Sequence, residues 1–202
     1  MARTPKVVED RREQIIDAAM RVFAQKGFIK ATNKDIAREA GITAGLIYYY
    51  FESKEALLNA IIETRTPIQL ISTLPPEALD LPPEIFLRML LRRVLGIIET
   101  EDFIGLIRVM LPEIIHNPAL APIPLAVFQR ILNFLTSYFE RKVASGELRQ
   151  IDVSLTVQIF FGSILGFLLR RHILRDPLAL SYTQEQIGEA IVDIILNGTR
   201  AQ

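Results

Sequence analysis

The 202-residue chain is half hydrophobic and 23% charged, with a mean hydropathy of +0.28, which excludes an intrinsically disordered protein. It contains no cysteine, which excludes a disulfide framework and a thiolate metal site, and its two histidines argue against structural zinc. The 23 basic residues balance the 23 acidic ones, but residues 1–54 carry ten basic and seven acidic residues, so positive charge is concentrated at the N-terminus. The first residues contain no apolar stretch of the signal-peptide type, and we expect a cytoplasmic protein.

The N-terminal quarter of the chain has the pattern of four helices. Apolar residues between Glu9 and Lys26 recur with the i, i+3, i+4 spacing of one helix face. The other three helices are expected over 33–40, over 44–50 and from 54 onward. The residues expected to cap or stop them are Gly27, Thr32 with Asp35, Gly41, Thr43 and Ser53.

The rest of the chain is also helical and more apolar. Residues 66–84 contain five prolines, so we expect a loop or an irregular crossing there, with Pro82 and Pro83 placed to start the next helix. Further helices are expected over 85–99, 103–115, from 124 or 125 to about 145, 154–174 and 183–197. The sum is roughly nine helices and no sheet, which predicts an all-α fold.

One segment raises the question of a membrane. Residues 153–169 carry no charge, but the segment is short for a span of about 20 residues and contains four polar side chains. A helix at an interface explains this composition better than a membrane span does, and we expect no membrane partner.

The stretch from Gly41 to Phe51 contains three consecutive tyrosines that one helix face cannot bury together. A short helix, a tight turn with Gly41 and a second short helix form the helix-turn-helix pattern. At about 100° per residue, Ile47 and Phe51 share the inward face, so Tyr48 and Tyr49 point outward. Tyr50 lies between these directions and is expected to pack on the flank. Exposed phenols on a helix that enters the major groove can donate hydrogen bonds to phosphate.

The sequence from about Arg11 to Leu58, roughly a quarter of the chain, resembles the DNA-binding domain of the TetR family of transcriptional regulators. The residues that carry this resemblance are Ile15, Ala18, Ala19, Phe23, Gly27, Phe28, Thr32, Asp35, Ile36, Ala37, Ala40 to Thr43, Gly45, Ile47, Tyr48, Tyr50, Phe51 and Ser53 to Leu57. Beyond them, the chain matches the family only in its length and its helical character.

The resemblance implies a set of DNA contacts. The residues that would contact backbone phosphates are Thr32, Lys34, Thr43, Tyr48, Tyr49 and Lys54. Those that would face the bases are Ala44, Gly45 and Leu46. Ala44, Leu46 and Tyr49 depart from the commonest residues of the family, which leaves the operator sequence open. An alanine or a leucine can touch a thymine methyl group but cannot make a bidentate hydrogen bond.

The resemblance also implies a division of labour along the chain. Residues 1–54 would form the DNA-binding domain, and residues 55–202 an effector-binding and dimerisation domain. The protein would be a homodimeric repressor, released from a palindromic operator by a small apolar or aromatic molecule, and it would need no cofactor.

Two sets of residues in the larger domain are candidates for these roles. Those expected to line an effector pocket are Phe86, Phe103, Ile107, Met110, His116, Phe128, Leu132 and Phe160, and each of them can also be ordinary core. His116 can equally cap a helix end. The pair Gly162 and Gly166 lies on one helix face and would let two helices approach closely, either from two chains or within one chain. The last helix would complete a two-fold four-helix bundle with it, through Ile191 and Ile195.

Other functions fit the sequence less well. It contains no Walker loop, GxSxG or GxGxxG, and Glu113 with His116 is the only i, i+3 pair of metal-ligand type, so we expect neither an enzyme nor a metal site. The alternatives that remain are a helical interaction protein that does not read DNA, and a DNA-binding regulator without a small-molecule effector.

Overall fold

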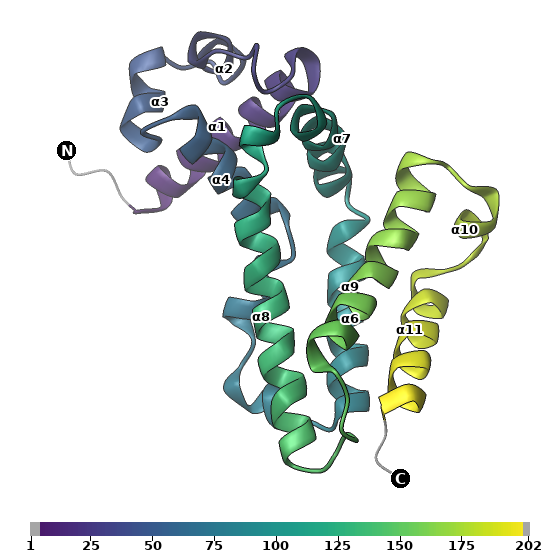
Figure 1. The fold of residues 1–202 in the computed structure, drawn as a ribbon. Helices are drawn as coiled ribbons and strands as arrows, with labels where there is room; N and C mark the ends of the chain where they lie inside the picture. Colours follow the sequence, from purple (N-terminus) through teal and green to yellow (C-terminus); the bar gives the residue numbers. More distant parts are fainter. Residues whose placement is uncertain (1–4, 200–202) are drawn as a thin grey trace. The chain divides into compact units, whose positions relative to one another are not determined.

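The computed structural model describes residues 5–199, and over that range the chain forms eleven α-helices and no β-strand (Figure 1). The predicted all-α class is therefore confirmed. The chain divides into two compact units. The first combines the residues up to Arg65 with Glu101–Leu125, and the second combines Thr66–Thr100 with the residues from Ala126 onward.

The first unit contains the four helices predicted at the N-terminus and one from the middle of the chain. These are α1 (Pro5–Lys26), α2 (Asn33–Glu39), α3 (Ala44–Tyr50), α4 (Lys54–Arg65) and α7 (Glu101–His116), followed by the 3₁₀ turn η2 (Pro118–Leu120). The predicted apolar stripe of α1 forms the centre of this unit, because Ile15, Ile16 and Ala19 are fully buried. Burial of these side chains stabilises the unit by roughly 1.5–3 kcal/mol for each large aliphatic residue.

The ends of these helices follow from individual residues. Gly27 ends α1 with a φ of +78°, a conformation that costs other residues free energy. The predicted capping box is present at α2, where the Thr32 hydroxyl accepts from the Asp35 amide and the Asp35 carboxylate accepts from the Thr32 amide. Ser53 caps α4 through the Ala56 amide at 3.0 Å. Thr43 precedes α3 as predicted, but its side chain makes no capping hydrogen bond.

The second unit is built from long helices and short connecting turns. Its elements are α5 (Ile68–Thr73), the 3₁₀ turn η1 (Pro76–Asp80), α6 (Pro83–Ile98), α8 (Pro122–Ala144), α9 (Val153–Leu168), the π-helical turn η3 (Leu169–Ile173), α10 (Pro177–Ser181) and α11 (Gln184–Thr199). The first residues of α8 belong to the first unit. Pro83 begins α6, as the paired prolines predict.

Aromatic and glycine contacts hold the long helices of the second unit together. Phe86 of α6 is fully buried and stacks on Tyr138 of α8, with ring centroids 4.0 Å apart. Phe128 of α8 meets Phe161 of α9 edge-on at 5.2 Å. Gly188 of α11 faces α6, where an added Cβ atom would lie in ordinary van der Waals contact with Leu95, at 3.5 Å. These contacts join α6 to α8, α8 to α9 and α6 to α11, the four long helices of this unit (Figure 1).

Two connections differ in detail from the expectation. Residues 66–84 form an irregular connection that contains α5 and η1 and is not a loop throughout. The helix expected over 154–174 is present from Val153 to Ile173, but its last turn, from Leu169 onward, is π-helical. Helices of five or six residues are too short to show a 3.6-residue period in the sequence, and a π-turn leaves no pattern of its own.

Candidate nucleic-acid interface

Helices α2 and α3 form a helix-turn-helix around a small buried core. Gly41 in the turn has a φ of +63°, and the amide of Ile42 donates to the carbonyl of Ala37 at 2.9 Å. Ile36 and Ile47 contribute side chains to the core that are at most 1% exposed. The pair therefore has a defined inside, and its other residues point toward solvent.

The helix-turn-helix is fixed to α1 by polar contacts at both ends of α2. At the start of α2, Lys26 bonds the Asp35 carboxylate at 2.6 Å. Together with the hydrogen bond from Thr32, this bond lowers the pKa of Asp35 to about 2. At the end of α2, the side chain of Gln14 donates to the carbonyl of Ala40 at 2.7 Å. The orientation of α3 thus depends on α1 as well as on the turn.

The outward face of α3 carries the two predicted tyrosines. Tyr48 is 61% exposed and Tyr49 is 71% exposed, whereas Ile47 and Phe51 on the opposite face are 1% and 5% exposed. Tyr50 is half-buried, with its ring edge-on against Tyr49. Its hydroxyl is buried without a hydrogen-bond partner among residues 5–199. The three adjacent tyrosines therefore divide as the helical geometry predicts, two outward and one into the flank.

The start of α3 presents little side chain. Gly45 is exposed, and a Cβ atom added to it would meet no atom within 4 Å. Ala44 and Leu46 are half-buried, and Thr43 is exposed with its hydroxyl free of any capping bond. A nucleic-acid backbone or base edge could therefore approach this end of the helix closely.

The predicted phosphate contacts outside α3 differ in how free they are. Lys34 is exposed and makes no ion pair within the described part of the chain, and the same holds for Lys30, which the sequence did not single out. Thr32 is exposed, but its hydroxyl is already bonded to Asp35 at 2.8 Å. Lys30 could have been found from the sequence, because it lies two residues before Thr32, the N-cap of α2, close to the other predicted phosphate contacts.

Lys54 has a different surrounding from the one its predicted role requires. Its ammonium group donates to the carbonyls of Phe28, Ile29 and Ala31 at 2.7, 3.0 and 3.1 Å, and it lies over the ring of Phe28. All three of its donors are used, so a phosphate contact would have to replace one of these bonds. In this structure Lys54 holds the connection between α1 and α2, and its contact with phosphate stays a prediction.

The eight predicted pocket residues are distributed over both units. In the first unit, Phe103 and Met110 are buried, Ile107 is half-buried and His116 is exposed. The ring of His116 lies 2.7 Å from the carbonyl of Pro112 on its own helix, a local contact at the helix end.

In the second unit, Phe86 and Phe160 are at most 1% exposed, and Phe128 and Leu132 are half-buried. The two most buried of these side chains are thus part of its core, and the pocket role of all eight residues stays a prediction.

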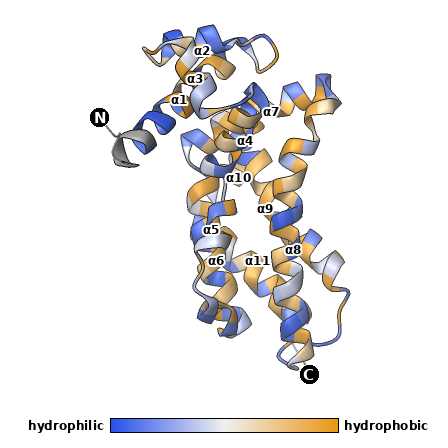
Figure 2. Cartoon of the chain, turned by 90° about the vertical axis from the view of Figure 1, so that its left-hand side faces the viewer, coloured by the Kyte–Doolittle hydropathy of each residue, from blue (hydrophilic) through white to orange (hydrophobic). Residues whose placement is uncertain are grey.

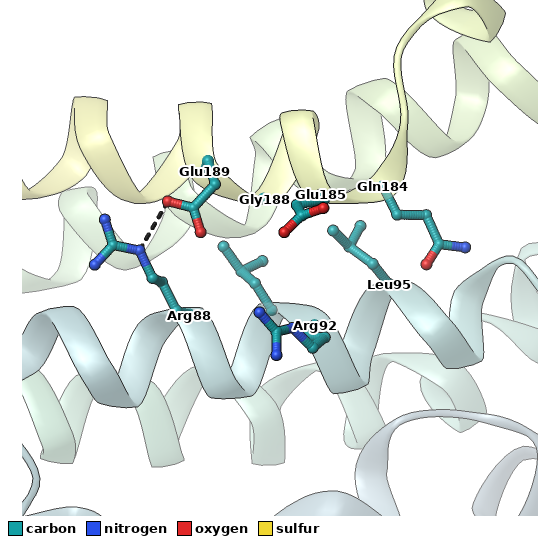
Figure 3. A pocket seen from close by; sticks show the side chains of 8 residues that line it. Arg88, Arg92, Leu95, Gln184, Glu185, Gly188 and Glu189 are labelled. Atoms are coloured by element: carbon teal, nitrogen blue, oxygen red, sulfur yellow. Dashed lines mark hydrogen bonds and ion pairs between the residues drawn. The ribbon is translucent and has the colours of Figure 1, made fainter.

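A groove of about 390 Å³ does lie in the second unit, between α6 and α11 (Figure 3). Its residues are Arg88, Leu91, Arg92, Leu95, Gln184, Glu185, Gly188 and Glu189, and none of them is a predicted pocket residue. Arg88 bonds Glu189 across it at 2.8 Å. The groove is lined by Gly188 and two leucines and rimmed by charges of both signs, which is unlike the apolar site that the sequence predicts.

The outward face of α9 is largely apolar, and Figure 2 shows how much of this helix is hydrophobic, whereas the exposed side chains of α11 are mostly polar. Leu155 and Ile159 are each 54% exposed and Ile194 is 71% exposed. Gly162 and Gly166 are exposed on the same helix as the first two, and a Cβ atom added to either would meet no atom within 4 Å.

Two of the predicted interface residues point elsewhere. Ile191 and Ile195 are only 5% and 7% exposed, because they pack inside the unit. On α11 it is therefore Ile194 that offers apolar surface to a partner.

The segment Val153–Ile173 is also long and apolar enough to cross a membrane by length and composition, with 22% of its most apolar window buried. The described residues contain no group of three or more histidine and carboxylate side chains placed to hold a metal ion.

Two family models cover most of the chain. Residues 15–61 match the model of bacterial regulatory proteins of the tetR family, and residues 86–197 match that of the C-terminal domain of AefR-like transcriptional repressors. The transcriptional regulator SrpR of Pseudomonas putida is 32% identical over 173 residues, which cover 83% of this chain and 78% of SrpR. The regulator HbdR of Aromatoleum sp. (strain CIB) is 50% identical over 54 residues, 27% of this chain and 24% of HbdR.

Solved structures share the fold at lower identity. SmeT in complex with triclosan superposes with a TM-score of 0.77 at 24% identity, over 96% of this chain and 93% of SmeT. FadR of Bacillus subtilis in complex with stearoyl-CoA gives a TM-score of 0.73 at 22% identity, over 92% of this chain and 98% of FadR.

Proposed function

Because the chain belongs to the TetR family of bacterial transcriptional regulators, we propose that it represses transcription as a homodimer on a palindromic operator and is released by a small apolar molecule. The observation that carries this proposal is the outward face of α3. Tyr48 and Tyr49 are exposed side by side on the second helix of a helix-turn-helix whose inward face is closed by Ile47 and Phe51. Side chains placed in this way can bond phosphate oxygens while the start of α3 faces the bases.

We infer a dimer from the small positive charge of the DNA-binding region, residues 1–54. Residues 1–54 carry only three more basic than acidic residues, and Lys26, Arg21 and Arg38 are engaged in ion pairs with Asp35 or Glu39. A single reading head would therefore bind DNA weakly, whereas two heads on one duplex multiply the affinity. We assign the partner copy to the exposed face formed by Leu155, Ile159, Gly162, Gly166 and Ile194.

The same assignment accounts for the apolar helix α9 without a lipid bilayer. Two copies that bury this face against each other remove its leucine and isoleucine side chains from water, which is the main driving force for such association. A DNA-binding protein also has to reach its operator, and we therefore place the dimer in the cytoplasm. Two-fold symmetry then requires a palindromic site, with half-sites about 34–36 Å apart.

The effector is proposed from the relatives and from the apolar character of the predicted pocket residues. SmeT is bound to triclosan, an apolar aromatic molecule, and FadR to stearoyl-CoA, which carries a long apolar acyl chain. The predicted pocket residues of this chain are apolar except for His116. An apolar or aromatic effector would weaken operator binding, and the operator would weaken effector binding by the same factor.

Selection from a pool of random duplex DNA tests the proposed operator binding. The wild-type protein is expected to enrich one palindrome, and the variant Tyr48→Ala/Tyr49→Ala to enrich none. Since both side chains are exposed, this variant should keep the wild-type melting temperature, which separates lost contacts from lost folding. Failure of the wild-type protein to enrich any sequence, even after it has been refolded away from small molecules, would refute the proposal.

A thermal-shift screen tests the effector. Stabilisation by at least one apolar compound, together with weaker binding of the selected operator in its presence, is the expected result. A screen of apolar and aromatic compounds without a single stabilising hit would favour a regulator that works without a small-molecule effector.

A further inference from the structure

The chain shows a conflict between sequence and packing at α7. By sequence, α7 falls within residues 86–197, which match the model of a C-terminal repressor domain. By packing, it belongs to the unit of α1 to α4, which carries the helix-turn-helix. An element of one domain that is fixed to the other is the place where the state of one is passed to the other.

The packing of α7 on α1 keeps a constant register. Gly105 of α7 faces Met20 of α1, and a Cβ atom at Gly105 would be 3.9 Å from the Met20 methyl group. Near the ends of the contact, Glu113 lies against Gly27, where a Cβ atom would clash with its carboxylate. The sequence separation is 85 or 86 residues at both points, so the two helices run side by side in the same direction over about two turns.

Arg65 joins three helices at the start of this contact. It is the last residue of α4, and its side chain is 18% exposed. One terminal nitrogen bonds both Glu13 and Asp17 of α1, at 3.0 and 2.5 Å. The Nε atom lies 3.3 Å from the carboxylate of Asp102, in the first turn of α7.

Arg65 is bonded more firmly to α1 than to α7. The bonds from Arg65 to α1 are aligned hydrogen bonds, whereas its Nε atom makes no hydrogen bond within the described residues and meets Asp102 only as an ion pair. The Asp102 side chain is 67% exposed, so it can move without disturbing the core. An interaction of this kind is easily loosened or tightened by a displacement of α7, while α1 and α4 stay joined.

We propose that Arg65 is a positioning residue that couples α7 to the DNA-reading helices through Asp102. A change in the position of α7 is transmitted through the Arg65 side chain to α1, and α1 holds α2, and with it α3, through Gln14 and Lys26. The inference rests on the proposed operator binding. It does not depend on knowing the effector, because coupling is reciprocal and operator binding must also restrain α7.

Hydrogen exchange measured by mass spectrometry tests this coupling, with the selected operator duplex as the only ligand. None of the predicted DNA contacts lies on α7. In the wild-type protein, we expect operator binding to slow exchange of the α7 amides, residues 101–116, by about five-fold or more. In Asp102→Asn, the slowing of the α7 amides should be clearly smaller than in the wild-type protein, while operator affinity stays within about three-fold of the wild-type value.

Glu101→Gln is the matched control. Glu101 lies in the same first turn of α7, is exposed and makes no ion pair within the described residues, so its substitution removes the same charge from the same helix end. It should transmit the slowing as the wild-type protein does. Arg65→Lys supplies a second variant, because a lysine keeps the charge but cannot hold the two sides with separate nitrogens.

The possible outcomes distinguish a failure of the proposed coupling from a failure of the proposed operator binding. Slowing of α7 in Asp102→Asn equal to that in Glu101→Gln would overturn the role of Arg65 and Asp102. Operator binding by the wild-type protein without any slowing of α7 would overturn the coupling itself and leave the proposed function intact. Failure of the wild-type protein to bind any duplex would overturn the proposed function and the coupling with it.

Discussion

The outward faces of α3 and α9 both expose large hydrophobic side chains, but the chemistry of the two faces differs. On α3, Tyr48 and Tyr49 end in hydroxyl groups that can donate hydrogen bonds. On α9, Leu155 and Ile159 are purely aliphatic and are followed by exposed glycines. The first face suits a charged partner with many oxygen acceptors, and the second suits another apolar surface. Exposed hydrophobic area alone therefore does not identify a partner, whereas the polar atoms within it do.

The largest effect is expected from a charge on the α9 face. Ile159→Glu should raise the dissociation constant of the dimer by on the order of 1000-fold, because two unpaired carboxylates would be buried at the two-fold interface. Sedimentation velocity over a range of concentrations measures this constant. Ile85→Glu is the control, since Ile85 is equally exposed at 54% but lies on α6. A dimer that tolerates both substitutions equally would place the interface elsewhere.

The tyrosine hydroxyls of α3 can be compared with one another. Tyr48→Phe should weaken operator binding by about ten-fold or more, because each chain of the dimer loses one hydrogen bond to phosphate, each worth about 1 kcal/mol. Tyr50→Phe should leave the affinity unchanged, because the Tyr50 hydroxyl is buried and has no partner within the described residues. Fluorescence anisotropy at one fixed salt concentration measures both, and an equal loss in the two variants would argue against the outward assignment.

Replacing either of two glycines of the first unit by alanine should change the free energy of unfolding, but in opposite directions. Gly27→Ala is expected to lower the free energy of unfolding by about 1–3 kcal/mol, because φ is +78° and the new Cβ atom meets Glu113. Gly45→Ala should instead raise it by up to about 1 kcal/mol, since Gly45 lies within a helix and its Cβ would meet open space. Urea unfolding measures both changes, and a stable Gly27→Ala protein would contradict the contact with α7.

The smallest expected effect is the loss of stability at low pH when Asp35 is protonated. The folded-state pKa of Asp35 is about 2, below the ordinary value of 3.8, so the ionised group stabilises the fold above about pH 4 and loses this contribution as the pH falls toward 2. The difference in stability between the wild-type protein and Asp35→Asn should therefore shrink between pH 5 and pH 2. A difference in stability that stays constant over this range would show that the bonds of Lys26 and Thr32 to Asp35 do not stabilise the fold through the charge of Asp35.

Much of the helix-turn-helix could be predicted because the residues that determine it lie close together in the sequence. A capping residue and its partner three positions on, as in Thr32 and Asp35, can be read from the sequence, and so can the inward and outward sides of α3. The environment of Lys54 could not be predicted, because the three carbonyls that hold it lie more than 20 residues earlier in the chain.

The same limit applies to the larger unit. Ile191, Ile194 and Ile195 are alike in sequence, and only the packing of α11 shows that Ile194 is the exposed one. The membership of α7 in the first unit depends on contacts across about 85 residues, for which helical periodicity carries no information.

The most direct test of the account is the number of chains bound to one operator. With the selected palindrome, sedimentation should show two chains on each duplex, and a duplex carrying a single half-site should bind at least about 100-fold more weakly. One chain per duplex, with equal affinity for the palindrome and the half-site, would contradict the claim that two α3 helices read one operator.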